Sequence, residues 1–174
     1  MNKYIGVVLL FAMTSCGNSA QDTAKVTDST KVAPTTTTKV VNLEDPEVQA
    51  IYAGYIELKD ALVNANDKGA REAAKELSAK LAAYKGCENT ALIANKIIAA
   101  KDLKEQRKEF TTLSADVIAM FKHAAINEGT IYVQHCPMAN NGDGGEWLSS
   151  NKEIRNPYYG DEMMECGAVI EEIK

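Results

Sequence analysis

The sequence predicts a mainly α protein: a four-helix antiparallel bundle with a loop-rich C-terminal segment and one or two short strands. Two observations lead to this prediction. Apolar residues recur at helical spacing through four consecutive segments before Gly129, with only short turns between them. After Gly129 this periodicity stops, and glycine, proline and aromatic residues become frequent. A chain of 174 residues has room for one folded domain of this kind.

The first two helices are indicated by the residues at their ends. Asp45 is a good cap for the first helix, because its carboxylate accepts hydrogen bonds from free backbone N–H groups. Pro46 fits the first helical position, and Glu47 suits the positive end of the helix. The second helix is rich in alanine, and we expect it to follow a cap at Asp67 and to stop at Gly86.

We expect the third helix to start near Asn89, and the fourth to follow almost without a break and to end at Gly129. The residues predicted to face inward are Leu92, Ile93, Ile97 and Ile98 in the third helix, and Leu103, Phe110, Leu113, Val117, Met120 and Phe121 in the fourth. Four amphipathic helices joined by short loops predict an antiparallel bundle.

The C-terminal segment, residues 130–174, has a different character. The stretches "TIYVQ", from Thr130, and "GAVIEEI", from Gly167, alternate in polarity as short strands do. The stretch between them is rich in glycine, but Trp147 and Tyr158 argue against disorder. We therefore expect this segment to fold back over one end of the bundle.

The N-terminal part is typical of an exported bacterial lipoprotein. Residues 1–15 contain a positive charge and a short apolar stretch, as a signal peptide does, and Cys16 follows in a context similar to a lipidation site. The alternative is an ordinary secretory signal in which Cys16 has no role. Residues 16–43 are rich in Thr and Ser and predict a flexible linker, and residues 44–174 form the predicted domain. The expected location is the periplasmic side of a bacterial membrane, the outer membrane more than the inner, with the chain held there by the lipid.

The charge of the chain excludes one class of function and favours another. The net charge is −5, and becomes −6 when Lys3 is removed with the signal peptide. No basic stripe is present, so nucleic-acid binding is not expected. From Glu128 onward, nine acidic residues stand against three basic ones, and such a surplus favours the approach of cations.

Two groups of sulfur-containing residues in this acidic segment suggest a metal site. Thiolate and thioether ligands select Cu(I) and similar soft ions over hard cations. Zinc more often uses four Cys or His ligands, and the chain contains no C-x-x-C pair. The candidate ligands are His135, Cys136 and Met138 in the first group, and Met163, Met164 and Cys166 in the second.

The alternative is a disulfide between Cys136 and Cys166. Thiols tend to pair in an oxidising compartment, and this bridge would close a loop of about 30 residues, worth about 3–4 kcal/mol. Met163 and Met164 would then fill gaps in the core, and His135 would lie at the surface. The residues alone leave both alternatives open. Catalysis is not expected, because neither a Ser–His–Asp arrangement nor a phosphate-binding glycine loop is present.

Four motifs carry a resemblance to a known family: "QRKEFTTLSADV", "HCPMA", "GEWLSS" and "IRNPYYGDEMMECG". Together, over about residues 44–174, they resemble a family of bacterial domains of unknown function. Members occur as small exported lipoproteins and as C-terminal extensions of periplasmic adaptor subunits of heavy-metal efflux pumps. The chain has no coiled-coil hairpin and no lipoyl-like or barrel strands, so it is not the adaptor itself.

The resemblance implies handling of copper or related metals in the periplasm, with Cys136, Met138, Met163 or Met164, and Cys166 as ligands and His135 optional. It also implies that "NPYYG" forms a rigid turn presenting the second sulfur group. We therefore expect a lipid-anchored Cu(I)-binding protein that buffers the ion or passes it to a heavy-metal efflux complex or another envelope protein. The contrasting expectation is a disulfide-stapled interaction module of the envelope without a metal role.

Overall fold

The computed structural model describes residues 40–174. The predicted signal peptide (residues 1–15), Cys16 and the predicted linker up to residue 39 lie outside the described residues. Within residues 40–174, none of the helices combines the length and the apolar character that crossing a bilayer requires.

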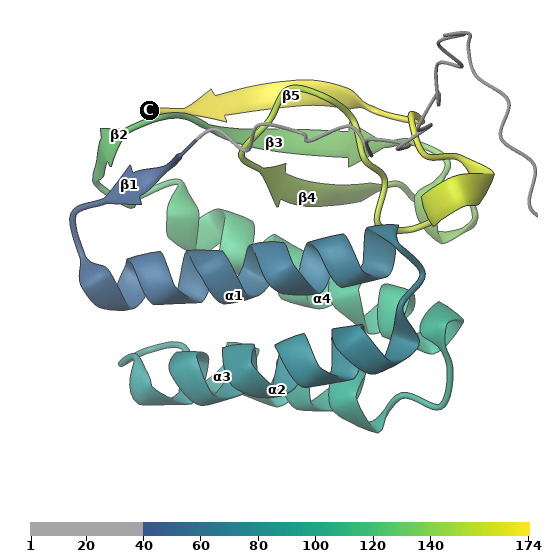
Figure 1. Cartoon of the computed structure of the whole chain (residues 1–174), viewed down its shortest axis with the longest axis horizontal. Helices are drawn as coiled ribbons and strands as arrows, with labels where there is room; N and C mark the ends of the chain where they lie inside the picture. Colours follow the sequence, from purple (N-terminus) through teal and green to yellow (C-terminus); the bar gives the residue numbers. More distant parts are fainter. Residues whose placement is uncertain (1–39) are drawn as a thin grey trace, which may run out of the picture. The chain divides into compact units, whose positions relative to one another are not determined.

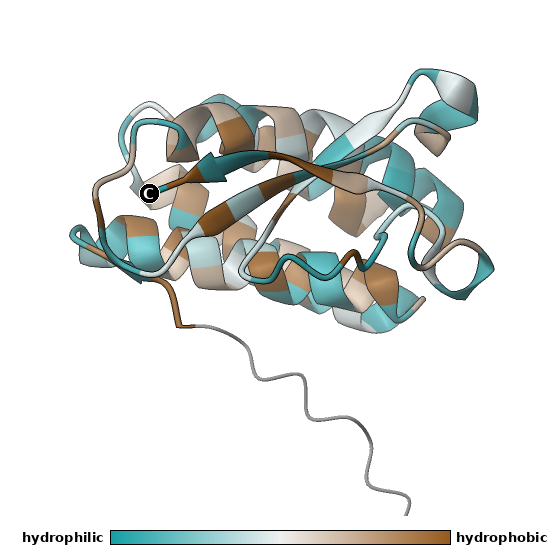
Figure 2. Cartoon of the chain, turned by 90° about the horizontal axis from the view of Figure 1, so that it is seen from above, coloured by the Kyte–Doolittle hydropathy of each residue, from teal (hydrophilic) through white to brown (hydrophobic). Residues whose placement is uncertain are grey.

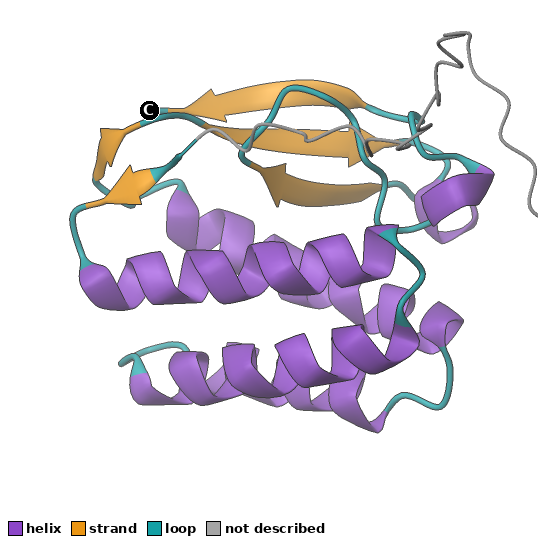
Figure 3. Cartoon of the chain, viewed as in Figure 1, coloured by secondary structure: helices purple, strands orange, loops and turns teal. Residues whose placement is uncertain are grey.

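Four helices form the larger part of the described chain, which confirms the predicted fold class. They are α1 (Pro46–Val63), α2 (Asp67–Ala83), α3 (Glu88–Ala99) and α4 (Leu103–Phe121). Each helix packs against the next one along the chain, and the connections are short (Figures 1 and 3). On these helices, apolar positions alternate with hydrophilic ones at helical spacing (Figure 2).

The predicted cap of α1 is confirmed, and that of α2 lies one residue earlier than predicted. The Asp45 carboxylate accepts hydrogen bonds from the backbone N–H groups of Glu47 and Val48, at 2.8 and 3.3 Å. In α2 the cap is Asn66, whose side-chain oxygen accepts a hydrogen bond from Gly69 N–H at 2.9 Å. Asp67 is the first residue of the helix instead.

Two predictions about α3 and α4 are wrong in detail. Leu92 is 61% exposed, because α3 packs through the smaller residues Ala91 and Ala94 together with Ile97. The fourth helix ends at Phe121 and not at Gly129. The residues between these two points leave the helix to pair with the start of the described chain.

In the part of the chain that the structure describes, five strands make two sheets. Strands β1 (Asn42–Leu43) and β2 (Ile126–Glu128) pair antiparallel, so part of the predicted linker is a short strand with Leu43 in the core. The larger sheet is antiparallel with the order β4-β3-β5. Its strands are β3 (Ile131–Cys136), β4 (Gly145–Ser149) and β5 (Ala168–Ile173). Strands β3 and β5 were predicted, whereas β4 lies where the sequence predicted a loop.

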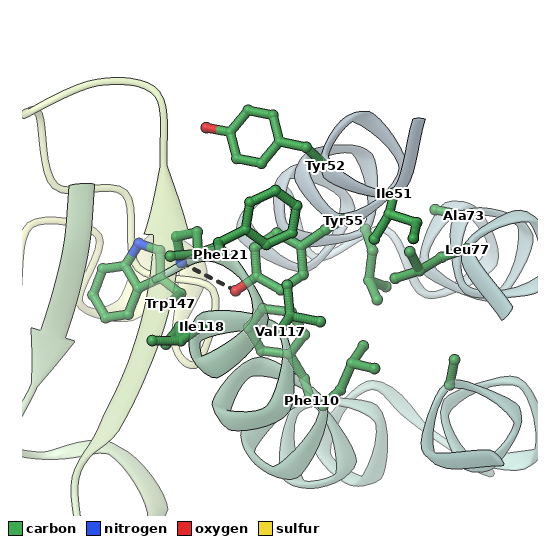
Figure 4. Close-up of a cluster of buried hydrophobic side chains, with 14 of the residues drawn as sticks. Ile51, Tyr52, Tyr55, Ala73, Leu77, Phe110, Val117, Ile118, Phe121 and Trp147 are labelled. Atoms are coloured by element: carbon green, nitrogen blue, oxygen red, sulfur yellow. Dashed lines mark hydrogen bonds between the residues drawn. The ribbon is translucent and has the colours of Figure 1, made fainter. Parts of the chain in front are cut away.

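The larger sheet lies along α1 and α4, with α2 and α3 on the other side of that pair (Figures 1 and 3). The C-terminal segment therefore covers a face of the bundle. The prediction that it covers one end of the bundle is wrong. Strand β4 contacts both α1 and α4. The reason is an apolar surface on both elements: Trp147 points from β4 into the same cluster as Phe121 (Figure 4), and both side chains are fully buried.

Aromatic side chains fill the space between α1, α4 and β4. The Tyr55 ring stacks on the Phe110 ring with 5.5 Å between centroids, and Tyr52 meets Phe121 at 5.3 Å. The Tyr55 hydroxyl lies 2.6 Å from Ser114 Oγ and accepts a hydrogen bond from the backbone N–H of Leu148 at 3.1 Å (dashed in Figure 4). This hydroxyl therefore joins both helices to the sheet.

Candidate sulfur site

The pairing of β3 with β5 brings the two sulfur groups together. In the antiparallel register His135 lies opposite Ala168, so the end of β3 meets the start of β5. The Sγ atoms of Cys136 and Cys166 are 3.1 Å apart, although 30 positions separate them in the chain. Both cysteines are free thiols, Cys136 fully buried and Cys166 partly exposed.

The segment that leads to Cys166 is shaped by one buried asparagine, Asn156. Its backbone N–H donates to Met164 O at 2.9 Å, and its side-chain amide donates to Cys166 O at 3.0 Å. Its side-chain oxygen accepts from Tyr158 N–H at 2.8 Å, and its carbonyl accepts from Gly160 N–H at 3.0 Å. All four polar groups of Asn156 are used, so residues 156–166 form a closed and well-fixed loop.

The turn after Cys136 is held against this loop. The Tyr159 hydroxyl donates to the Met138 carbonyl at 2.6 Å. The Met138 side chain is 54% exposed, and it follows Cys136 by two positions in the chain.

The two thiols change each other's chemistry. The hydrogen bond between Cys136 and Cys166 is the main cause that raises the pKa of the Cys166 thiol, and burial adds to it. The N–H of Met138 acts in the opposite direction. Cys166 therefore carries a proton at neutral pH, which an incoming metal ion must displace.

The other predicted ligands are placed less favourably. Met163 and Met164 are partly buried and belong to the loop through their backbone: Met163 O accepts from Cys166 N–H at 3.1 Å. In residues 40–174 neither of these thioethers makes a hydrogen bond with the thiols. Across the same residues, no three His, Cys, Asp or Glu side chains converge in the way that a metal site of those ligands requires.

The structure does not bring His135 to the cysteine pair. Its Nδ1 lies 3.8 Å from Glu146 Oε1 on β4, and its ring packs on Gly144, where an added Cβ would be 2.7 Å from Cε1. Neighbouring residues of a strand point to opposite sides, which separates His135 from Cys136.

Cys87, the remaining cysteine of the described residues, lies before α3. Its Sγ is 3.9 Å from the Met120 sulfur on α4, so it packs within the bundle and does not join the C-terminal pair. Burial, with the nearby carboxylates of Glu88 and Asp116, raises the pKa of the Cys87 thiol.

Two residues that organise the site were missed in the sequence. Asn156 acts through backbone groups, which its position in "NPYYG" does not reveal. Gln134 is buried in β3, and its amide donates to the carbonyls of Asn151, Lys152 and Glu153 at 2.8, 3.3 and 3.1 Å. A glutamine within the otherwise apolar "IYVQ" is a signal that a buried polar contact is needed.

The comparison with known families gives one match. Residues 51–129 match the model of a family described as "Protein of unknown function (DUF3347)". This supports a relation to a domain family of unknown function, and the matched part begins within α1 and ends at Gly129, before β3. No curated protein and no solved structure matches the chain. The match therefore includes the helices and β2 but not the sulfur site.

Proposed function

We propose that the chain binds a soft metal ion, Cu(I) in the first place, between Cys136 and Cys166 with Met138 as a third ligand. The observation that supports this most is the 3.1 Å separation of two thiols, one of which, Cys136, is followed two positions later by the exposed Met138.

The donor set favours a soft ion. Two thiolates and a thioether bind Cu(I) well. Zinc more often takes four Cys or His ligands and hard cations take several oxygen ligands, and within residues 40–174 no three His, Cys, Asp or Glu side chains converge to supply such a set. Metal–thiolate bonds of about 2.3 Å keep two sulfur ligands further apart than 3.1 Å. A rotation of the partly exposed Cys166 side chain provides that small widening.

The role that follows is metal buffering or transfer in the cell envelope. The predicted lipid anchor at Cys16 holds the domain on the periplasmic side of the membrane, and the acidic surplus after Glu128 attracts cations. Cys166 and Met138 lie at the surface, where a heavy-metal efflux complex or another envelope protein can exchange ligands with them. The other predicted ligands, Met163, Met164 and His135, have secondary roles in this proposal or none.

A disulfide-stapled interaction module of the envelope is the second candidate. The same short distance between Cys136 and Cys166 favours it, as does the complete burial of Cys136. In that case the bridge closes the loop of Asn156 and the protein binds its partner without metal.

A competition titration separates the candidates. The full-length protein is reduced and titrated with Cu(I) against a chelator of known affinity. One equivalent of tightly bound Cu(I) is expected, with at least about tenfold weaker binding when Met138, Met163 and Met164 are all replaced by leucine, a change that largely conserves side-chain volume. Met120→Leu is the matched control, because the Met120 sulfur lies 3.9 Å from Cys87 Sγ on the helices and is not a ligand in this proposal.

Two results would count against the proposal. Unchanged affinity in the triple variant would remove the thioethers from the site. Absence of tight binding in the reduced wild-type protein would exclude the metal role and leave the stapled module.

A further inference from the structure

The geometry of the cysteine pair lies between that of a disulfide and that of a metal-bound pair. A disulfide bond is about 2.05 Å long, so the sulfur atoms at 3.1 Å need to approach by only about 1 Å to form one. To hold a metal ion they must separate slightly. Small side-chain rotations are therefore enough to reach either state.

The backbone around the pair is held by contacts that do not involve the two sulfur atoms. Cys166 is held by its own N–H, which bonds Met163 O, and by its carbonyl, which bonds Asn156. Gly167 follows with φ +148°, and a Cβ there would be 2.8 Å from the carbonyl oxygen of His135. This close approach keeps the ends of β3 and β5 together whatever the thiols do.

The two thiols differ in access. Cys136 is fully buried, whereas Cys166 is partly exposed. A reagent in solution therefore reaches Cys166 first. Because no further His, Cys, Asp or Glu completes the site within residues 40–174, metal binding depends on both of these sulfur atoms.

We infer that the Cys136–Cys166 pair is a redox gate: as a disulfide it excludes the soft metal ion, and as a dithiol it binds it. This regulation rests on the proposed metal-binding function. It joins the two candidate functions in one site with two states.

The closing reaction is thiol–disulfide exchange with an oxidising disulfide of the compartment. The Cys166 thiolate attacks that disulfide, forms a mixed disulfide and releases one thiol. The Cys136 thiolate then attacks Cys166 Sγ, the internal bond forms, and the second thiol leaves. The pair loses two electrons and two protons, and the external disulfide gains them and becomes two thiols. Reduction by a dithiol reverses both steps.

The test uses the full-length protein in oxidised and reduced glutathione buffers. Alkylation followed by peptide mass spectrometry reads each cysteine, and the Cu(I) competition titration is run on the same samples. Oxidation is expected to protect Cys136 and Cys166 from alkylation together and to lower Cu(I) affinity at least a hundredfold. Reduction is expected to restore the alkylation of the two cysteines and the Cu(I) affinity. Cys87→Ser is the matched control and should behave as wild type.

Serine variants test the order of attack. Cys136→Ser is expected to accumulate a glutathione adduct at Cys166, whereas Cys166→Ser should leave the buried Cys136 unmodified. An adduct of equal yield at Cys136 would overturn the entry through Cys166.

Different results would contradict the redox gate and the proposed metal-binding function. If the oxidised protein binds Cu(I) as tightly as the reduced one, or if both thiols stay alkylatable after oxidation, the gate is wrong while the metal site stands. If the reduced protein does not bind Cu(I), the metal site itself is wrong, and the gate with it.

Discussion

The hydroxyl of Tyr55 offers a sharp test of how the sheet is attached to the helices. It accepts a hydrogen bond from Leu148 N–H at 3.1 Å and lies 2.6 Å from Ser114 Oγ, and all three residues are fully buried. Strand β4 is an edge strand, and this bond satisfies an N–H group that faces α1 and not β3. Tyr55→Phe removes the hydroxyl and keeps the ring.

The expected loss of stability is about 2 kcal/mol. A buried donor that loses its acceptor costs about 1–3 kcal/mol, and Tyr55→Phe takes away the hydroxyl that accepts from the Leu148 N–H. Ser114 contributes less, because its hydroxyl can turn to a carbonyl of its own helix. The stacking of the ring on Phe110 is retained in the variant.

Urea unfolding of the full-length protein measures this loss. The free energy of unfolding should fall by about 2 kcal/mol at an unchanged m value, with a melting temperature lower by roughly 6–10 °C. Tyr84→Phe is the matched control: its hydroxyl meets Asp45 at 3.5 Å in a more exposed place, and its loss should cost less than about 0.5 kcal/mol. Equal effects of the two variants would refute the reasoning.

Three further predictions concern the loop, a helix end and an ion pair. Asn156→Ala removes two side-chain hydrogen bonds of a buried residue and should lower the free energy of unfolding by about 2–3 kcal/mol. The same change should make Cys136 accessible to alkylation. If Cys136 stays protected, Asn156 does not hold the loop that covers the cysteine pair. Asp102→Ala removes the cap of α4 and should cost about 1 kcal/mol in a urea titration, and no change would show that the cap is dispensable. The hydrogen bond from Lys152 is the largest cause that lowers the pKa of Glu172, to about 2. The Glu172 carboxylate therefore stabilises the fold fully above its unfolded pKa of about 4.3, and this stabilisation is lost as the pH falls through about 2. Lys152→Ala should raise that pKa in an NMR titration, and an unshifted value would exclude the ion pair in solution.

The helical half of the fold could be predicted because its signals are local. Asp45 caps its helix through neighbouring N–H groups, and the apolar spacing of α1 and α4 depends on helix geometry alone. Leu92 shows the limit: it fits the apolar stripe of α3, but the contact is made by alanines, and only the neighbouring helix decides which side is buried.

The C-terminal half depends on distant partners. Strand β4 follows a run of glycines and becomes a strand because β3 pairs with it and Tyr55 bonds its outer edge, 93 positions away. For the candidate site, the pair of Cys136 and Cys166 could be named from their residue types. The exclusion of His135 follows from strand alternation, whereas the role of Asn156 depends on backbone groups that no sequence pattern displays.

The antiparallel pairing of β3 with β5 also has a consequence for the order of folding. The helices contact their neighbours in the chain, so their assembly requires only short loop closures, whereas β3 meets β5 across a much longer segment. We therefore expect the helices to form first and the two thiols to meet last. A preparation with a normal helical circular dichroism spectrum can still lack the paired cysteines, so helicity alone is no measure of a completed site.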